Sequence, residues 1–264
     1  MQHLLRKQII LLVCLLSISF TSFAQSDEIY RPYNDEKPVY LGLNIGLTSN
    51  YMNFERGANF SNPGIDMANW ISPVFNKALV MGLSGNLRLN SHFLLRTNPN
   101  ILITGNKDIF YYKKSNNILD TFKMSTPSTI INIPIALKLE SDRYNLFKLP
   151  NFMRHYVFAG VKFDYDFSAS KDANGNNKKN GNLENTYSRL LNAADYGYEF
   201  GLGVSFYFPY ATISPEIKFS YGQRDMIYSR TSAQTKLLNG LDKLTSNFVY
   251  FTIHVEGESF NWKN

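Results

Sequence analysis

Apolar and polar residues alternate one by one along several stretches of this chain. In Thr129–Glu140 every odd position from Ile131 to Leu139 is Ile or Leu, whereas the even positions include Asn132 and Lys138. Successive side chains of a β-strand point to opposite faces of the sheet. This stretch therefore predicts a strand with one apolar and one polar environment.

The same period recurs along the rest of the chain. Seven further stretches show it: Leu41–Leu47, Met81–Arg88, Phe93–Tyr112, Val157–Phe167, Tyr198–Phe206, Ile213–Tyr221 and Val249–Glu256. Eight strands are an even number, which suits a closed antiparallel barrel of the bacterial outer-membrane type. We therefore predict an all-β fold, an eight-stranded antiparallel up-and-down transmembrane β-barrel, over residues 39–260.

The connectors between these stretches alternate in length. Short connectors are predicted at Asn90–His92 and Pro209–Tyr210, with a middling one at Ser141–Arg154. Four long connectors are predicted at Glu55–Ala78, Lys113–Ser128, Ala169–Tyr196 and Arg224–Ser246. Up-and-down barrels of the outer membrane have short periplasmic turns and long outer loops. The pattern places both chain ends in the periplasm and every long connector outside.

The first 24 residues have the composition of a secretory signal peptide. A basic start at Arg6 and Lys7 precedes an apolar run from Ile9 to Phe20, and Ser22–Ala24 is a cleavage-like ending. The alternative, an uncleaved anchor, is disfavoured because the apolar run is short and contains serines. We expect a signal peptide at 1–24, then a short periplasmic segment at 25–38, most simply disordered, although it offers a partner protein a place to pair.

The polar face of the predicted strands carries charges of both signs. The cations are Arg88, Arg96, Lys138, Lys162 and Lys218, and the anions are Glu140, Asp164, Asp166, Glu199, Glu216 and Glu256. Such a balanced set suits a narrow interior in which each charge is paired. The other face is Ile, Leu, Val and Phe, with Tyr40, Tyr165 and Tyr221 expected as an aromatic girdle near the strand ends. A soluble barrel of the lipocalin type, the main alternative, would place apolar residues inside.

Composition excludes several classes of function. The single Cys lies in the signal peptide, so thiolate metal sites and cysteine nucleophiles are excluded from the mature chain. The 27 Lys and Arg, two of them in the signal peptide, exceed the 21 acids by too little to indicate nucleic-acid binding. No nucleotide or metal motif is found, so no cofactor and no small-molecule substrate are expected. A filled interior also argues against a porin.

Three histidines and two acids are the candidates for chemistry. His92 and His155 are predicted at the short-turn end, and His254 faces inward close to Glu256. We favour a buried His254 satisfied by a neighbouring acid over a catalytic base. Asp164 and Asp166 share a face with Lys162 and are likewise interpreted as structural. We therefore predict no catalytic, cofactor-binding or metal-binding residues. Lys171–Gly181 is interpreted as a solvated outer loop, with contact to lipopolysaccharide phosphates as the alternative.

The order of motifs resembles the PorT family of outer-membrane barrel proteins, which occurs in bacteria with type IX secretion and gliding motility. The motifs that carry the resemblance are LGLNIGL (Leu41–Leu47), GLSGNLRLNSHFLLRTNPNILI (Gly82–Ile103), STIINIPIALKLES (Ser128–Ser141), HYVFAGVKFDYDFSA (His155–Ala169), YEFGLGVSFYF (Tyr198–Phe208), SPEIKFSYG (Ser214–Gly222) and LDKLTSNFVYFTIHVE (Leu241–Glu256). Two segments depart from the family pattern, Tyr30–Tyr33 and Leu146–Arg154.

The resemblance implies a non-enzymatic component needed to export C-terminally tagged cargo to the cell surface. Its partners would be outer-membrane lipid and other proteins of the secretion system. Two other functions remain open from the residues: a barrel that displays its loops to host or lipid ligands, and an outer-membrane hydrolase that uses His254.

Overall fold

The computed structural model describes residues 31, 35, 37–57, 70–73, 76–115, 118–146, 149–169, 173–177, 185–187, 191–228 and 241–257. Within these residues the chain forms thirteen strands of one antiparallel sheet. Their bounds are β1 (Val39–Arg56), β2 (Trp70–Pro73), β3 (Asn76–Arg88), β4 (Phe93–Thr97), β5 (Asn100–Ser115), β6 (Ile118–Glu140), β7 (Tyr144–Leu146), β8 (Leu149–Asp166), β9 (Ala173–Asn177), β10 (Asn185–Tyr187), β11 (Ala194–Tyr207), β12 (Thr212–Gly222) and β13 (Leu241–Glu256). No described helix is long and apolar enough to cross a membrane. The predicted signal peptide, 1–24, lies outside the described residues.

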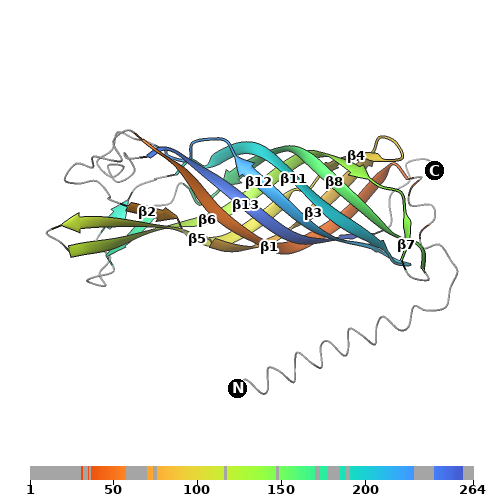
Figure 1. Ribbon diagram of the computed structural model, residues 1–264, viewed down its shortest axis with the longest axis horizontal. Coiled ribbons are helices and arrows are strands. Elements are labelled where there is room, and N and C mark those ends of the chain that lie inside the picture. Colours follow the sequence, from red (N-terminus) through yellow and green to blue (C-terminus); the bar gives the residue numbers. More distant parts are fainter. Residues whose placement is uncertain are drawn as a thin grey trace, which may run out of the picture.

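The strand pairings close into a ring, which we call the wall. Its order is β1, β3, β4 with β5, β6, β8, β11, β12 and β13, and β13 pairs back onto β1. β4 and β5 occupy one position because both pair with β3 on one side and β6 on the other. Each neighbour in the ring is the next wall strand along the chain (Figure 1). The prediction of an eight-stranded up-and-down barrel is confirmed.

A break in the third wall position separates β4 from β5. A continuous strand over Phe93–Tyr112 was predicted, but Asn98 and Pro99 lie outside both strands. Proline has no N–H to donate to a neighbouring strand. Its carbonyl oxygen instead accepts a hydrogen bond from the Leu83 amide at 3.1 Å. Gly82 permits this approach, since a Cβ there would lie 2.2 Å from the same oxygen.

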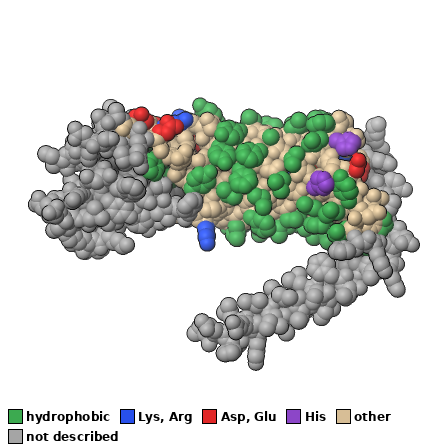
Figure 2. Space-filling model, viewed as in Figure 1, with side chains coloured by type: hydrophobic (Ala, Val, Ile, Leu, Met, Phe, Trp, Pro, Cys, Tyr) green, Lys and Arg blue, Asp and Glu red, His purple; other side chains and the backbone are tan. Residues whose placement is uncertain are grey.

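The two faces of the wall have the polarity that the alternation predicts. Outward positions are exposed and apolar, including Leu43, Ile45, Ile133, Val161 and Phe251. Figure 2 shows hydrophobic side chains covering the middle of the wall, with charged side chains towards its two ends. The inward positions are buried and mostly polar or charged. This arrangement excludes the lipocalin type, in which the apolar face would be the inner one.

The predicted long connectors contain strands of their own. Lys113–Ser128 was predicted as a loop, yet β5 runs to Ser115 and β6 begins at Ile118. This hairpin extends beyond the wall (Figure 1), and it pairs with β2 on one side and with β9 on the other; β9 pairs in turn with β10. We call these five described strands the outer sheet. The prediction failed because strands were placed by period-two apolar alternation, and the residues from Lys113 to Ile118 show none.

The other connector bounds also shift. Glu55–Ala78 contains the end of β1, all of β2 and the start of β3, and Arg224–Ser246 contains the first residues of β13. Within Ala169–Tyr196, part of the predicted loop Lys171–Gly181 is β9. Ser141–Arg154 contains β7 and the start of β8, which pair as a hairpin. The short connectors Asn90–His92 and Pro209–Tyr210 lie between strands as predicted.

Candidate functional site

The centre of the lumen is occupied by a group of buried side chains from four wall strands, which we call the central cluster: Arg96, Tyr156, Phe158, Glu216 and His254. Arg96 Nη1 donates a hydrogen bond to Glu216 Oε2 at 2.5 Å, and Tyr156 donates to the same oxygen at 2.9 Å. The Arg96 guanidinium lies over the Phe158 ring, 5.0 Å from its centroid. The Glu216 carboxylate and the Arg96 Nη atoms thus find partners inside the wall, whereas the buried Arg96 Nε has no hydrogen-bond partner among the described residues.

His254 belongs to this cluster, but its acidic partner is not the predicted one. Its Nε2 lies 3.5 Å from Glu216 Oε1, on the neighbouring strand β12, and 3.0 Å from Arg96 Nη2. Thr252 also contacts this nitrogen at 3.1 Å. Glu256 was expected as the partner because it is close in sequence, but its carboxylate instead accepts a hydrogen bond from Asn86. The acidic partner of His254 therefore comes from the adjacent strand β12, where Glu216 lies opposite Thr252, and not from the residue two positions along β13.

Asp164 and Asp166 have separate sets of partners. Asp164 accepts hydrogen bonds from Lys162 Nζ and Asn132 Nδ2, both at 2.6 Å. Asp166 accepts one from the Ser128 hydroxyl at 2.6 Å, and the backbone N–H of Ser168 donates to it at 3.0 Å. Both carboxylates are buried. These contacts suit structural roles, in which Asp164 neutralises a buried lysine and Asp166 holds the turn after β8.

A further ion pair and an apolar cluster fill the lumen between these groups. Lys218 pairs with Glu199 at 3.0 Å and lies over the Tyr250 ring at 4.3 Å. The apolar cluster contains Val80, Leu102, Ile130, Phe248 and Tyr250. The interior was predicted to hold charges of both signs, and this apolar cluster was not predicted. The alternation could have indicated this cluster, because each of its five residues lies at an inward position of its strand.

The lumen ends, on the side of the short turns, in a second charged group that we call the short-turn mouth: Arg88, Lys138, Glu140, Arg143 and Arg154. Glu140 pairs with Lys138 and Arg154, both at 2.8 Å, and with Arg88 at 3.6 Å. Arg143 lies over the Tyr207 ring, 3.8 Å from its centroid. The group closes this end of the barrel with cations in excess.

Two described residues of the N-terminal segment 25–38 contact the short-turn mouth. Asp35 pairs with Arg143 at 2.9 Å, with Arg154 at 3.1 Å and with Arg88 at 3.7 Å. Arg31 donates to the Thr212 hydroxyl at 2.8 Å and to the backbone carbonyls of Glu256 and Gly257. The segment was expected to be disordered, whereas these two side chains are bound to the barrel. No local sequence signal indicates such contacts, because their partners come from five different parts of the chain.

Tyr40 is not part of an aromatic girdle. Its ring is buried at the short-turn mouth, and its hydroxyl accepts a hydrogen bond from Arg88 Nε at 2.6 Å. The alternation already implied this, since Leu41 and Leu43 point outward and residue 40 must point inward. Tyr165 is exposed on the outer face as predicted, and Tyr221 stacks on Tyr198 with centroids 5.4 Å apart.

The other two histidines lie at the short-turn end, as predicted. His92 is exposed in the turn between β3 and β4, where its Nε2 lies 3.2 Å from Asp142 Oδ1. His155 points to the outer face and stacks on Tyr144 with centroids 5.0 Å apart. Neither belongs to the central cluster, and no contact between two histidines is found among the described residues.

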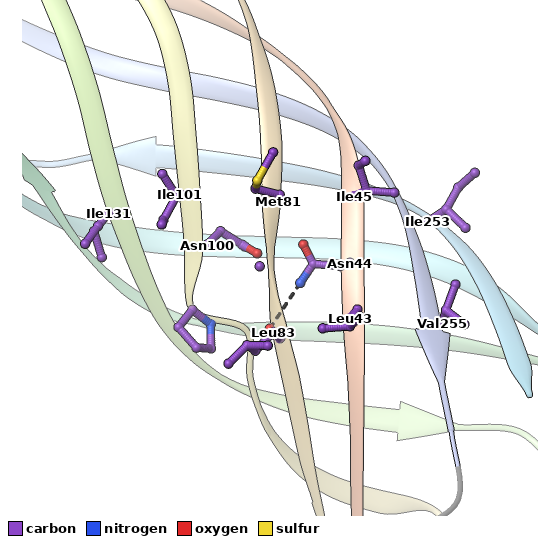
Figure 3. Close-up of a pocket in the computed structure, with 12 residues that line it drawn as sticks. Leu43, Asn44, Ile45, Met81, Leu83, Asn100, Ile101, Ile131, Ile253 and Val255 are labelled. Carbon is purple, nitrogen blue, oxygen red and sulfur yellow. Dashed lines mark hydrogen bonds between the residues drawn. The ribbon is translucent and has the colours of Figure 1, made fainter.

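A groove of about 830 Å³ lies on the outer face of the wall beside the break between β4 and β5. Figure 3 shows its apolar lining, which includes Leu43, Ile45, Met81 and Ile101. Asn44 lies behind this lining and donates a hydrogen bond to the Leu83 carbonyl at 3.1 Å. The groove belongs to the same apolar band that covers the rest of the wall.

Space inside the lumen is small. Two cavities lined by described residues, one at the short-turn mouth and one beside Asp164 and Asp195, each measure about 10 Å³. Such a volume holds about one water molecule. Among the described residues, no three His, Asp or Glu side chains are grouped so as to hold a metal ion. The interior is therefore packed as a barrel of eight strands allows.

Sequence comparison agrees with this architecture. The model of a family described as outer membrane protein beta-barrel domain matches residues 23–228, which is more than half of the chain. The chain belongs to this outer-membrane β-barrel family. The protein is therefore located in the outer membrane, where its apolar band faces lipid. The short turns of such barrels lie in the periplasm and the long loops outside, so we expect the short-turn mouth to face the periplasm and the outer sheet to face the exterior.

Several solved outer-membrane barrels are similar in fold. Ail, the attachment invasion locus protein of Yersinia pestis, is 11% identical over 83% of this chain and 99% of its own, with a TM-score of 0.37. Neisserial surface protein A is 12% identical over 81% and 96%, with a TM-score of 0.38. The outer membrane protease OmpT from Escherichia coli is 10% identical over 89% and 100%, with a TM-score of 0.44. No curated protein matches the chain.

Proposed function

We propose that this outer-membrane barrel is a non-enzymatic accessory or scaffold component of type IX protein secretion. The resemblance of nearly all the mature chain to the PorT family supports the choice of pathway. The observation that supports a scaffold role is the packed lumen, in which ion pairs and apolar side chains fill the space inside the wall. A barrel of this kind contributes through surfaces that bind other proteins rather than through a pore.

The environment of the central cluster supports a structural role for His254. Its side chain and that of Glu216 are 4% and 1% exposed, so a substrate has no route to either. Both side chains contact Arg96 and each other, and Thr252 and Tyr156 add hydrogen bonds to His254 and Glu216 respectively. General acid–base catalysis requires hydrogen-bond reach to a bound substrate. The hydrolase alternative therefore has little geometric support.

Deleting the gene in its native bacterium tests the pathway. We expect C-terminally tagged proteases and adhesins to be lost from the cell surface and to accumulate in the periplasm, and gliding to stop where the bacterium glides. Wild-type gene supplied on a plasmid should restore both, which controls for effects on neighbouring genes. Normal surface export in the deletion strain, with outer-membrane integrity unchanged, would reject the proposal.

The outer sheet favours a second candidate, a barrel that binds host or lipid ligands outside the cell. Five paired strands there form an ordered platform beyond the wall, rather than a set of loops alone. Shortening the hairpin from Lys107 to Met124 to a tight turn would remove its centre while leaving the wall intact. Loss of surface adhesion with normal cargo export would support this candidate, and loss of export with normal adhesion would reject it.

A further inference from the structure

The short-turn mouth holds more positive than negative charge. Four cations, Arg88, Lys138, Arg143 and Arg154, contact two carboxylates, those of Glu140 and Asp35. Glu140 is part of the wall, whereas Asp35 belongs to the segment before β1. The net excess means that the mouth is electrostatically suited to a further carboxylate, or to a replacement for Asp35.

The arginines are held in position by groups other than Asp35. Arg154 is held by Glu140 at 2.8 Å, and Arg88 binds the Tyr40 hydroxyl at 2.6 Å and the Ser91 carbonyl at 3.0 Å. Arg143 lies on the ring of Tyr207. Their side chains are only 6–10% exposed. A site built in this way keeps its shape when Asp35 leaves, and preorganisation of this kind favours binding.

The contact with Asp35 has the geometry of carboxylate recognition. Arg154 Nη1 donates to Asp35 Oδ1 at 3.3 Å and Nη2 donates to Oδ2 at 3.1 Å. This paired arrangement matches two guanidinium donors to the two oxygens of one planar carboxylate. Asp35 itself is 32% exposed and lies outside the strands, so it is the least enclosed member of the group.

We propose that Arg88, Arg143 and Arg154 form a carboxylate-binding site, which Asp35 fills from the same chain and which an acidic segment of a periplasmic protein fills in its place. The inference deepens the proposed function, since the partner would be a periplasmic component of the secretion system. The three arginines lie at the end of the lumen and not on the apolar band. This position favours a protein segment that approaches from the periplasm over a lipid headgroup.

Binding of a labelled peptide to the purified mature chain in non-ionic detergent tests the site. The probe is fluorescein-labelled hexaglutamate, with labelled hexaglutamine as the uncharged comparison. A tethered competitor has an effective concentration of order millimolar, so removing the charge in D35N should raise the affinity for hexaglutamate about tenfold or more. Hexaglutamine should bind neither protein. Equal hexaglutamate affinity of wild type and D35N would overturn the proposal.

A second variant separates this site from general electrostatic attraction. In R143Q one ligand-binding guanidinium is lost while Glu140 keeps Arg88, Lys138 and Arg154. The gain in D35N should disappear in D35N/R143Q. The matched control is D142N, which removes one negative charge from the same connector at a side chain 86% exposed and paired with His92. It should bind hexaglutamate as wild type does, and a tenfold gain in D142N would overturn the proposal.

Inorganic phosphate distinguishes a peptide site from a site for small anions. At phosphate concentrations equal to the concentration of peptide carboxylates, hexaglutamate should stay bound to D35N. Full displacement would show a free-anion site and overturn the proposal. These measurements do not depend on secretion, so normal export in the deletion strain would reject the pathway while leaving the site intact. Absent peptide binding combined with failed export in the deletion strain would reject the site alone.

Discussion

Arg96 and Glu216 form an ion pair across the full width of the lumen, with 2.5 Å between Nη1 and Oε2. Arg96 lies on β4, in the third position of the ring, and Glu216 lies on β12, in the seventh of eight. The two strands therefore face each other across the barrel axis. This pair joins opposite sides of the wall and makes the interior depend on both partners.

Removing one partner of this pair should be much more costly than removing both. R96M leaves the Glu216 carboxylate buried without its closest cation, and we expect a loss of about 3–5 kcal/mol in the free energy of unfolding. The double variant R96M/E216M should recover most of that loss, because no uncompensated charge remains. Urea titration of vesicle-refolded protein, scored by the mobility of unheated samples on gels, measures both values. A double variant as unstable as R96M would contradict the assignment.

Two interior lysines should differ in their contributions to stability. Lys218 is the one ion-pair partner of Glu199 among the described residues, so K218M should cost about 3–5 kcal/mol. Glu140 keeps Arg88 and Arg154 when Lys138 is replaced, so K138M should cost about 1 kcal/mol. The same urea titration gives the ranking. Equal losses would mean that the extra cations at the short-turn mouth do not compensate for Lys138.

The loss of stability caused by a charge on the outer face of β6 should depend on how deep in the bilayer the charge lies. Ile133 and Leu139 are both exposed and apolar, and Leu139 is next to the end of the strand. A lysine near the middle of the bilayer costs about 2–4 kcal/mol and one near the interface about 0–1 kcal/mol. I133K should therefore be destabilised by the larger amount and L139K by the smaller, as measured by refolding into vesicles. The opposite order would contradict the position of the apolar band.

Glycine at position 201 gives the Phe158 ring its space in the lumen. A Cβ there would lie 2.6 Å from that ring and 2.5 Å from the Ile217 carbonyl oxygen. G201A should therefore cost about 1–3 kcal/mol through overpacking. G85A is the matched control, since its nearest atom would be 3.7 Å away, and it should leave stability within about 0.5 kcal/mol of wild type. Thermal shifts of gel mobility report both effects, and an undisturbed G201A would show that the lumen is looser than described.

The packed lumen predicts the electrical behaviour of the protein. Planar bilayers containing the purified barrel should show no steady conductance steps in concentrated KCl, because charged and apolar clusters fill the interior. A porin of 16 strands reconstituted in parallel serves as the positive control, since its lumen is an aqueous channel. Stable steps from the folded barrel would mean that ions pass the central cluster.

The fold was accessible from the sequence because the lipid and the lumen impose opposite demands on alternate residues. The alternation correctly predicted which residues of β6 and β8 face inward. It also predicts that Tyr40 points inward, but Tyr40 was expected in an aromatic girdle instead. The outer sheet was missed because strands were placed by this alternation, which is weak or absent in the segments that form that sheet. The break at Pro99 could not be predicted without knowing that Gly82 of β3 lies beside it.

The contacts within the lumen were much harder to predict. The sequence indicated balanced charges but not which charges meet, since the stagger between strands decides which inward residues lie at one level. Proximity along the chain suggested Glu256 for His254, whereas the barrel supplies Glu216 from β12. Asp35 gives no local signal at all. Its three arginines lie on β3, on β8 and in the connector after β6.

The pairing of β1 with β13 has a consequence for how the protein is assembled. This long seam joins the first wall strand of the chain to the last, from Gly42 opposite Glu256 to Arg56 opposite Leu241. Until the final strand has been synthesised and delivered to the membrane, every shorter intermediate is an open sheet with two unpaired edges, which lipid cannot satisfy. Insertion must therefore wait for the whole chain, so loss of the last strand would prevent insertion rather than give a smaller barrel.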